Sequence, residues 1–407
     1  MDKKRLQIYA ELIVKSGINP SAGQAVVITA GLEQPEFTRM VVEECYKAGA
    51  SEVVVNFSDM TIDKYAQIYQ AEENLSHLAP WEKARWQWIS EKFPARIWLD
   101  SDDPDGMAGI DQEKYSRTFS SRVKEIKPMR DIIENRHQWC IAAVPSIAWA
   151  QKVFPDCSAD EAVEKLWEAI LSASRANGDA IANWEEHNKT VHARCEKLNA
   201  YKFKQLHYKS SNGTDFTVGL MKEGIFCGAA ETDLAGRVFN PNIPSEEVFT
   251  TPKRGEADGV LVSTKPLSWQ GTLIENFSIR FENGKAVEVR AEKGETALQK
   301  MISVDENAPY LGECALIGKN SPINNSGILF YNTLFDENAS CHVALGRGFD
   351  NCIENYDRYT KEELKSLGVN DSVIHVDFMI GSDDLEITGT TFDGKEIKVF
   401  TNGEWSI

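Results

Sequence analysis

The pattern of hydrophobic and polar positions changes about halfway along the chain. In the first half, short apolar runs at residues 25–29, 53–57, 95–99 and 139–144 alternate with longer segments of helical periodicity. Continuous apolar runs are typical of strands covered on both faces, and strands that alternate with helices form a mostly parallel sheet. We therefore predict an N-terminal α/β domain with a mostly parallel sheet over residues 1–197.

Two helices of this first part have clear sequence signals. Ser158, with Glu161 three residues later, forms a capping box, which predicts that a helix begins there. Residues 183–198 form a second helical stretch that carries His187 and His192. A spacing of five residues directs these imidazoles to different sides of the helix, whereas metal-binding pairs on a helix are four residues apart. We therefore expect packing or solvated roles for both.

After residue 201, alternating strands and tight turns replace the helical segments. Asn283-Gly284 interrupts a strand-like run over residues 279–289, and Asp393-Gly394 repeats the signal near the C-terminus. Asn-Gly and Asp-Gly pairs favour the two-residue turns of β-hairpins. We therefore predict an α+β C-terminal domain rich in antiparallel strands over residues 198–407, which would carry the metal-binding catalytic site.

The composition limits the partners of the chain. Its 407 residues carry a formal charge of −18, whereas nucleic-acid binding requires clustered Lys and Arg, so we expect no nucleic-acid partner. No glycine-rich phosphate-binding motif follows a strand, which argues against a nucleotide-dependent enzyme. The sequence has no apolar leader and no long apolar run, and its eight cysteines form no Cys-x-x-Cys pair. We expect a cytoplasmic protein with free thiols and no membrane contact.

Carboxylates and imidazoles recur in apolar or glycine-rich surroundings in the second half. His375 and Asp377 are two residues apart in an apolar strand-like run, so both side chains point to one face. Burying such groups is costly unless they are paired or bind a cation, and oxygen and nitrogen donors suit a hydrolytic divalent metal. The residues alone leave open a metal site or a polar hydrogen-bonded network; the candidate ligands fall in four clusters, at residues 242–249, 312–313, 336–342 and 375–377.

Three segments carry a family resemblance. Residues 243–250, 332–340 and 375–382 are similar to segments of the aminopeptidase T/aminopeptidase S family of metal-dependent exopeptidases, and the likeness extends along nearly the whole chain. The resemblance implies a two-domain protein that forms a homodimer around an enclosed cavity. It further implies release of N-terminal amino acids from short peptides with two divalent metal ions, zinc or cobalt.

The resemblance also implies roles for individual residues. Glu313 would bridge the two ions, one of them held in addition by Glu247, His342 and Asp377 and the other by Glu337 and His375. A pair of ions a few ångströms apart makes water a usable nucleophile near neutral pH. Glu246 is a candidate general base that passes a proton to the leaving amine, although a merely solvated neighbour of Glu247 fits this position equally well.

One position departs from the family pattern. After His342 the family usually has a tyrosine that is thought to donate a hydrogen bond to the developing oxyanion, and this chain has Phe349. Loss of one such donor typically costs on the order of a hundredfold in rate. The neighbouring candidates to replace it are Arg347, Tyr356 and Tyr359. Two functions of other classes stay open: a mononuclear non-haem iron oxygenase on the same scaffold, and a non-catalytic peptide-binding protein.

Overall fold

The computed structural model describes all 407 residues, which form two compact units. One unit contains Met1–Glu186 and Ala230–Ser245, and the other contains His187–Ala229 and Glu246–Ile407. The predicted boundary between residues 197 and 198 lies within helix α9 (Ala180–Tyr201), and the return of residues 230–245 to the first unit has no counterpart in the predicted division. The assignment of separate roles to two domains stays a prediction.

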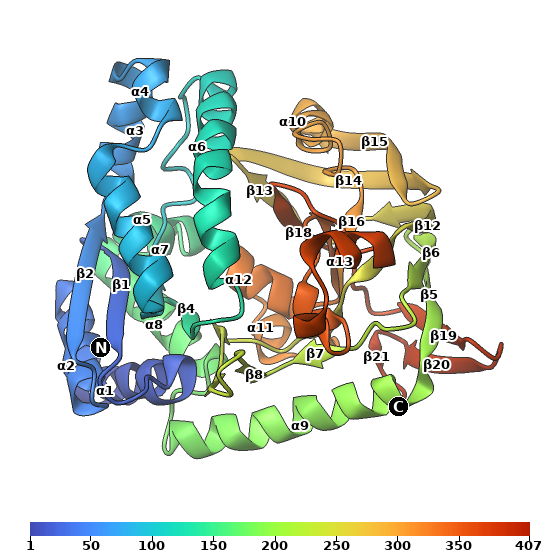
Figure 1. Cartoon of the computed structure of the whole chain (residues 1–407), viewed down its shortest axis with the longest axis horizontal. Helices are drawn as coiled ribbons and strands as arrows, with labels where there is room; N and C mark the ends of the chain where they lie inside the picture. Colours follow the sequence, from blue (N-terminus) through green and yellow to red (C-terminus); the bar gives the residue numbers. More distant parts are fainter. The chain divides into compact units, whose positions relative to one another are not determined.

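The first unit is built around a five-stranded sheet with the strand order β10-β4-β3-β1-β2. Its strands β1, β2 and β4 are labelled in Figure 1. Every pairing in this sheet is parallel, which confirms the predicted α/β fold class. Its strands are β1 (Ala25–Gly31), β2 (Glu52–Ser58), β3 (Ala95–Asp100), β4 (Trp139–Ala143) and β10 (Asn242–Ile243). The longer helices are α1 (Lys3–Leu12), α2 (Pro35–Lys47), α3 (Met60–Tyr69), α5 (Pro80–Lys92), α6 (Gln112–Ile133) and α8 (Ala159–Ala173).

Local sequence signals account for several of these elements. The capping box at Ser158 and Glu161 is confirmed as the start of α8, which buries Leu166, Trp167 and Ile170. Trp167 packs against the ring of Phe37 from α2 with 5.3 Å between ring centroids. Aromatic and aliphatic side chains on facing helices therefore form the core that the helical periodicity predicted.

The second unit contains two antiparallel sheets. The larger has the order β13-β14-β12-β6-β5-β19-β20-β21, with β15 beside β14, and the smaller has the order β18-β17-β16-β11-β7. The larger sheet consists of β5 (Phe203–Lys209), β6 (Asp215–Leu220), β12 (Pro252–Val262), β13 (Leu267–Trp269), β14 (Thr272–Glu282), β15 (Lys285–Lys293), β19 (Glu386–Thr391), β20 (Glu396–Thr401) and β21 (Glu404–Trp405). The smaller consists of β7 (Cys227–Gly228), β11 (Val248–Thr250), β16 (Leu311–Leu316), β17 (His342–Gly346) and β18 (His375–Met379). The antiparallel C-terminal fold class is confirmed.

The predicted hairpins are also confirmed. Asn283 and Gly284 join β14 to β15 with φ values of 49° and 82°, the positive values that a type I′ turn requires. Gly394 has a φ of 88° in the turn between β19 and β20. The turn residues thus have the backbone conformation that a tight turn requires, although each strand pair also contains a register shift.

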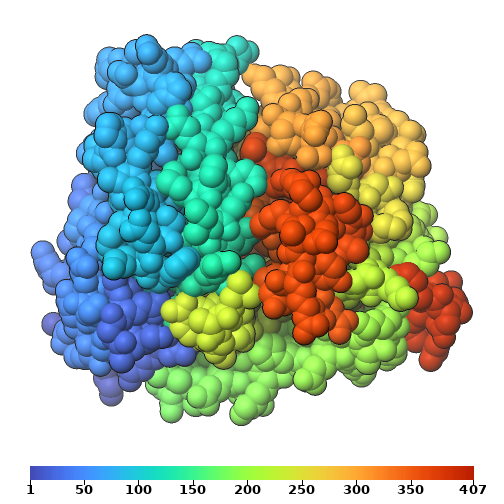
Figure 2. All heavy atoms as spheres, viewed as in Figure 1, coloured from blue at the N-terminus to red at the C-terminus, as the bar shows by residue number.

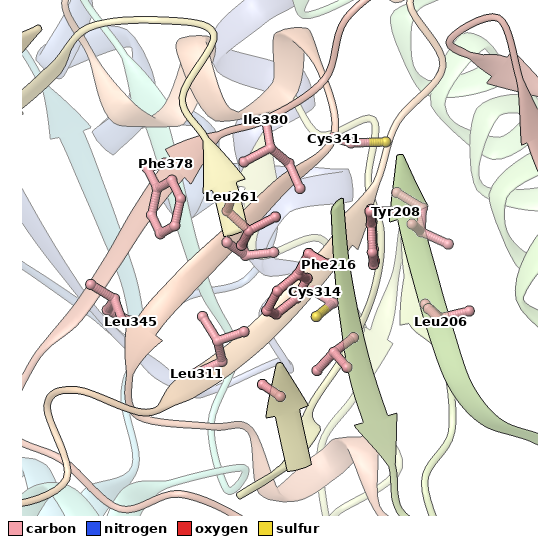
Figure 3. Close-up of a cluster of buried hydrophobic side chains, with 14 of the residues drawn as sticks. Leu206, Tyr208, Phe216, Leu261, Leu311, Cys314, Cys341, Leu345, Phe378 and Ile380 are labelled. Atoms are coloured by element: carbon pink, nitrogen blue, oxygen red, sulfur yellow. The ribbon is translucent and has the colours of Figure 1, made fainter. Parts of the chain in front are cut away.

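A shared apolar core joins the sheets of the second unit. Figure 3 shows side chains from both sheets meeting in it, including Phe216 of the larger sheet and Leu345 of the smaller one. Helix α13 (Lys361–Leu367) and the turns before it cover a small separate cluster formed by Met221, Ile353 and Leu364. Residues 350–367 lie at the surface of this unit in Figure 2.

None of the helices contains an apolar stretch of the length that a bilayer crossing requires. All eight cysteines are free thiols, and Cys157 and Cys227 are the two that are not fully buried.

Candidate metal centre

Five of the six candidate ligands lie on or beside neighbouring strands of the smaller sheet. Glu247 directly precedes β11, Glu313 is in β16, His342 is in β17, and His375 and Asp377 are in β18. The sixth, Glu337, opens the 3-10 helix η2 (Glu337–Ala339) that leads into β17. Residues separated by up to 130 positions in the sequence are therefore brought to adjacent strands by the sheet order.

Strand alternation sends these ligands to the face opposite the core. Phe378 and Leu345 point into the apolar core in Figure 3, so the intervening Asp377 and Ala344 face the other way. Across the strands, Ala344 is paired with Asp377 on one side and with Glu313 on the other. The small methyl group of Ala344 thus separates two carboxylates and leaves space above it for a ligand.

A break in the strand register sets the direction of Glu313. In β16 Leu311 is opposite Leu345, but Glu313 is already opposite Ala344, so β16 contains one extra residue. As a result Leu311 and Cys314 both face the core in Figure 3, whereas Glu313 joins the polar face. Gly312 permits this bulge because a Cβ there would lie 2.1 Å from the backbone oxygen of Arg347.

Both histidines are held by backbone carbonyl groups. His342 Nδ1 lies 2.9 Å from the backbone oxygen of Glu337, and His375 Nδ1 lies 2.7 Å from that of Arg347. Since a carbonyl only accepts, each Nδ1 is the protonated nitrogen, and each Nε2 is directed at the carboxylates. This arrangement is the usual support for an imidazole that binds a metal through its other nitrogen.

The ligand atoms converge in two overlapping groups. Glu247, Glu313 and His342 offer atoms within 4.8 Å of one another, and Glu313, His375 and Asp377 form a second such group. His342 Nε2 lies 3.4 Å from Glu247, and His375 Nε2 lies 3.0 Å from Glu313 and 3.3 Å from Asp377. Glu313 is the member common to both groups.

Without a cation, this cluster retains protons. Burial and the neighbouring carboxylates Asp377 and Glu247 raise the pKa of Glu313 to about 7 and the pKa of Glu337 well above its usual value. Burial disfavours the charged form of His342, but its contacts with Glu247 and Glu313 outweigh this effect and raise its pKa to about 10. Both results reflect an excess of negative charge that a divalent cation would neutralise.

Asn338 organises the segment around Glu337 and Glu246. Its side-chain amide donates to the backbone oxygen of Leu334 at 2.9 Å and lies 3.4 Å from Glu337 Oε1, and its carbonyl oxygen accepts the Glu246 backbone N–H at 2.7 Å. Glu246 is buried beside Glu247, with 9 % of its surface exposed. No sequence pattern predicts this role of Asn338, because an asparagine that connects two distant segments has no local signature.

The donor set fits a divalent transition metal better than an ion-free polar network. Asp377 Oδ1 is buried and meets His375 Nε2 at 3.3 Å as an ion pair, but no contact to this oxygen has hydrogen-bond geometry. A native polar network normally satisfies such an atom, since leaving it unpaired costs on the order of 1–3 kcal/mol. Imidazole nitrogens and carboxylate oxygens, with hydrogen-bonded support behind them, are the ligands that hydrolytic zinc-type sites use.

The ion-free structure groups Asp377 with Glu313 and His375, because Asp377 and His375 share one face of a single strand. Asp377 also acts electrostatically on His342, so its expected place on one ion with Glu247 and His342 stays a prediction. Glu337 lies near both Asp377 and Glu247, as the influence of these carboxylates on its pKa indicates. Which residues bind which ion, and the general-base role of Glu246, stay predictions.

Phe349 lies directly at this cluster. Its ring centroid is 4.9 Å from that of His375 and 5.3 Å from that of Phe249. Thr251 fixes its backbone by accepting from the Phe349 N–H and donating to the Phe349 carbonyl. Tyr356 and Tyr359 pack against the separate cluster that contains Met221 and Leu364. The structure therefore puts an apolar ring, without a hydroxyl group, beside the candidate ligands.

Comparison with known proteins identifies the family. The sequence matches the thermophilic metalloprotease (M29) family over residues 2–405. The chain belongs to this family. Aminopeptidase AmpS of Bacillus subtilis is 40% identical over 405 residues, which cover 99% of this chain and 98% of the relative. The structure of wild-type AmpT from Thermus thermophilus superimposes with a TM-score of 0.90 at 37% identity and covers 100% of both chains.

Membership of the M29 family and the carboxylate–imidazole groups together support binding of a divalent metal. A second solved structure, 2,5-dihydroxypyridine dioxygenase from Pseudomonas putida KT2440, has a TM-score of 0.51 at 12% identity over 98% of this chain and 96% of that one. This likeness concerns the fold alone. The oxygenase alternative is not favoured, because the full-length relatives are metalloproteases by family and aminopeptidases by name.

Proposed function

We propose that this chain is a metal-dependent aminopeptidase that releases N-terminal amino acids from short peptides with a pair of divalent ions. The observation that carries the proposal is the presence of Glu313 in both ligand groups, because a carboxylate shared by two groups can hold two cations close together. The names of the M29 relatives support the peptidase reaction. Zinc or cobalt suits the mixed oxygen and nitrogen donors.

We propose that the metal ligands are those predicted from the sequence: Glu247, Glu313, Glu337, His342, His375 and Asp377. Divalent ions at these positions would supply Lewis acidity, which polarises the scissile carbonyl and lets water attack near neutral pH. His342 and His375 keep the Nε2 lone pair directed at the site because their Nδ1–H groups donate to backbone carbonyls.

Glu246 is the proposed general base. Asn338 accepts the Glu246 backbone N–H, and Glu246 is buried and directly precedes the proposed ligand Glu247, which supports this role. In the proposed reaction Glu246 accepts the proton of the attacking water and transfers it to the leaving amine. The Glu246→Gln variant should retain its metal and lose roughly 10²–10⁴-fold in kcat. The exposed Glu396→Gln is the matched control, and an active Glu246→Gln enzyme would reassign the base.

The direct test combines metal analysis with peptide hydrolysis. Protein loaded with zinc or cobalt should contain two equivalents of metal and release the first residue of leucyl- or arginyl-peptides. A single equivalent of iron without hydrolysis would support an oxygenase. Tight peptide binding without release under any metal would support the non-catalytic alternative that Phe349 suggests. The proposed homodimer is checked separately by light scattering, and the proposed cytoplasmic location by cell fractionation.

A further inference from the structure

A pocket in the second unit is lined in part by Ser340, two residues before the proposed ligand His342. It has a volume of about 270 Å³, and its lining includes Thr264, Lys265, Ile317, Lys319, Ser340 and Gly381. None of these residues belongs to the proposed ligand set. A pocket of this size is slightly smaller than those that bind drug-sized molecules, so it suits one end of a short peptide.

Two hydroxyl groups in this pocket have no hydrogen-bond partner in the protein. The side-chain oxygens of Thr264 and Ser340 are both buried and unpaired, and Ser340 as a whole is only 7 % exposed. Native proteins seldom leave buried hydroxyl groups unsatisfied. Each oxygen has less than 1 Å² of accessible surface, so it would donate to a ligand oxygen after a small shift of its surroundings.

The charge of the pocket selects an anion. Lys265 forms no ion pair within 4.0 Å, although its charge acts on the buried Asp336 carboxyl, and the Lys319 side chain donates to the backbone oxygen of Asp383 at 3.3 Å. Asp383 is the single acidic residue of the lining, and it is exposed to solvent. Two lysines and two hydroxyl groups in one small pocket form a site for a carboxylate or a similar anion, because charge-assisted hydrogen bonds are the stronger ones.

Strand pairing connects this pocket to the ligand cluster. The Thr264 backbone N–H donates to the Met379 oxygen at 2.9 Å, and Met379 is paired with His342. Ser340 precedes His342 by two residues, and it packs against Gly381, where a Cβ would lie 3.0 Å from the Ser340 hydroxyl oxygen. Pro266 and Leu267, which follow Lys265 in the sequence, line another pocket together with Asp377.

We propose that this pocket binds the C-terminal carboxylate of the peptide substrate through Lys265, Lys319, Thr264 and Ser340. The inference rests on the proposed aminopeptidase function and names the substrate class as di- and tripeptides with a free C-terminus. Ser340 has extended backbone and lies two positions before His342, a distance of roughly 7 Å along the chain. One or two extended residues beyond the scissile bond span roughly 3.5–7 Å, so longer peptides place their carboxylate beyond the pocket.

The test compares a peptide acid with its amide. Metal-loaded enzyme is assayed with Leu-Gly-Gly and with Leu-Gly-Gly amide, and kcat/KM for the acid should exceed that for the amide by roughly 10- to 100-fold. The Lys265→Met variant should bring this ratio close to one, and Ser340→Ala should lower it by a smaller factor. The Lys285→Met variant, which removes an exposed lysine of the same unit, should keep the wild-type ratio.

The outcomes separate this inference from the function on which it rests. Hydrolysis of acid and amide at equal rates would overturn the carboxylate pocket and leave the aminopeptidase intact. If neither peptide is cleaved, the proposed function fails. Titration calorimetry with the same two peptides then decides the pocket, which stands only if the acid binds more tightly and Lys265→Met removes the difference. Cleavage of Leu-Gly-Glu amide as fast as Leu-Gly-Gly would assign the site to acidic side chains and overturn the C-terminal assignment.

Discussion

The two faces of the smaller sheet in the second unit carry opposite chemistry on the same strands. One face contributes Leu345, Phe378 and Cys314 to an apolar core, and the other gathers Glu313, His342 and Asp377. The apolar face gains free energy from burial, whereas the polar face buries like charges that repel one another. The smaller sheet thus stabilises the fold through one face, and its other face carries a cluster of repelling charges that a bound cation would stabilise.

Removing the shared carboxylate should have the largest effect on this contrast. The Glu313→Gln variant keeps the shape of the side chain but removes the charge common to both ligand groups. We expect a loss of bound metal and a fall in kcat/KM of roughly 10³-fold or more, beyond the 10–100-fold typical of losing a supporting group. The metal-free variant should be at least as stable as the metal-free wild type, because one buried charge has gone.

Metal content by mass spectrometry and thermal unfolding check this prediction together. The exposed Glu396→Gln serves as control for loss of a carboxylate as such. Full metal occupancy in Glu313→Gln would show that the two groups do not depend on the shared residue.

Truncating a side chain of the apolar face should lower the stability of the fold and leave metal binding intact. Leu345 is fully buried beside the site-facing Ala344, and Leu345→Ala should lower the free energy of unfolding by about 2–5 kcal/mol. The side chains of the proposed metal ligands extend from the opposite face of the sheet, so metal binding should persist at temperatures well below the melting temperature. Denaturant unfolding and metal titration measure the two properties. Loss of metal affinity without loss of stability would mean that the faces are not separable.

A substitution at the edge of the polar face should improve function. Phe349 already lies against His375, so Phe349→Tyr adds a hydroxyl group there with little change in packing. We expect unchanged metal content and a rise in kcat that approaches a hundredfold, the typical contribution of one oxyanion donor. Phe249→Tyr, on the other ring of the pair, is the matched control. A fall in kcat for Phe349→Tyr would indicate that this member stabilises the oxyanion differently.

The sequence predicted most of the fold and the place of the cluster because both depend on local patterns. Apolar runs marked the parallel strands, Asn283-Gly284 marked a hairpin, and the spacing of His375 and Asp377 placed both on one strand face. These features follow from the two-residue period of a strand and from turn chemistry. The metal-site interpretation needed the family resemblance, because no spacing in the sequence brings Glu247 to His342.

Features that depend on contacts between distant segments could not be predicted from the sequence. The bulge at Gly312 depends on the approach of Arg347 from another strand, and the return of residues 242–243 to the first sheet depends on pairing with β4. No sequence pattern indicated that Ser340 and Lys265 line one pocket, since a pocket made of separate segments exists only after folding. In each case the cause is a contact between residues far apart in the sequence.

The smallest expected effect is a pH dependence that differs between the metal-free and metal-loaded protein. The pKa of Glu313 rises from 4.5 to about 7 on folding, and that of His342 rises from 6.5 to about 10. In both cases the folded state binds more protons than the unfolded state, so the free energy of unfolding falls as pH rises. The contribution of Glu313 is complete below pH 4.5 and is lost as pH rises through 7. That of His342 is complete below pH 6.5 and is lost through about pH 10.

We therefore expect the metal-free protein to lose several degrees of melting temperature between pH 6 and pH 10. Metal binding competes with the same protons, so the stabilisation by zinc should grow over this range instead. Differential scanning calorimetry of both forms at matched ionic strength measures the two slopes. In metal-free Glu313→Gln the decline around pH 7 should flatten while the decline toward pH 10 remains, because His342 still titrates there. Parallel slopes for the metal-free and metal-loaded wild type would show that the polar face does not exchange protons for cations.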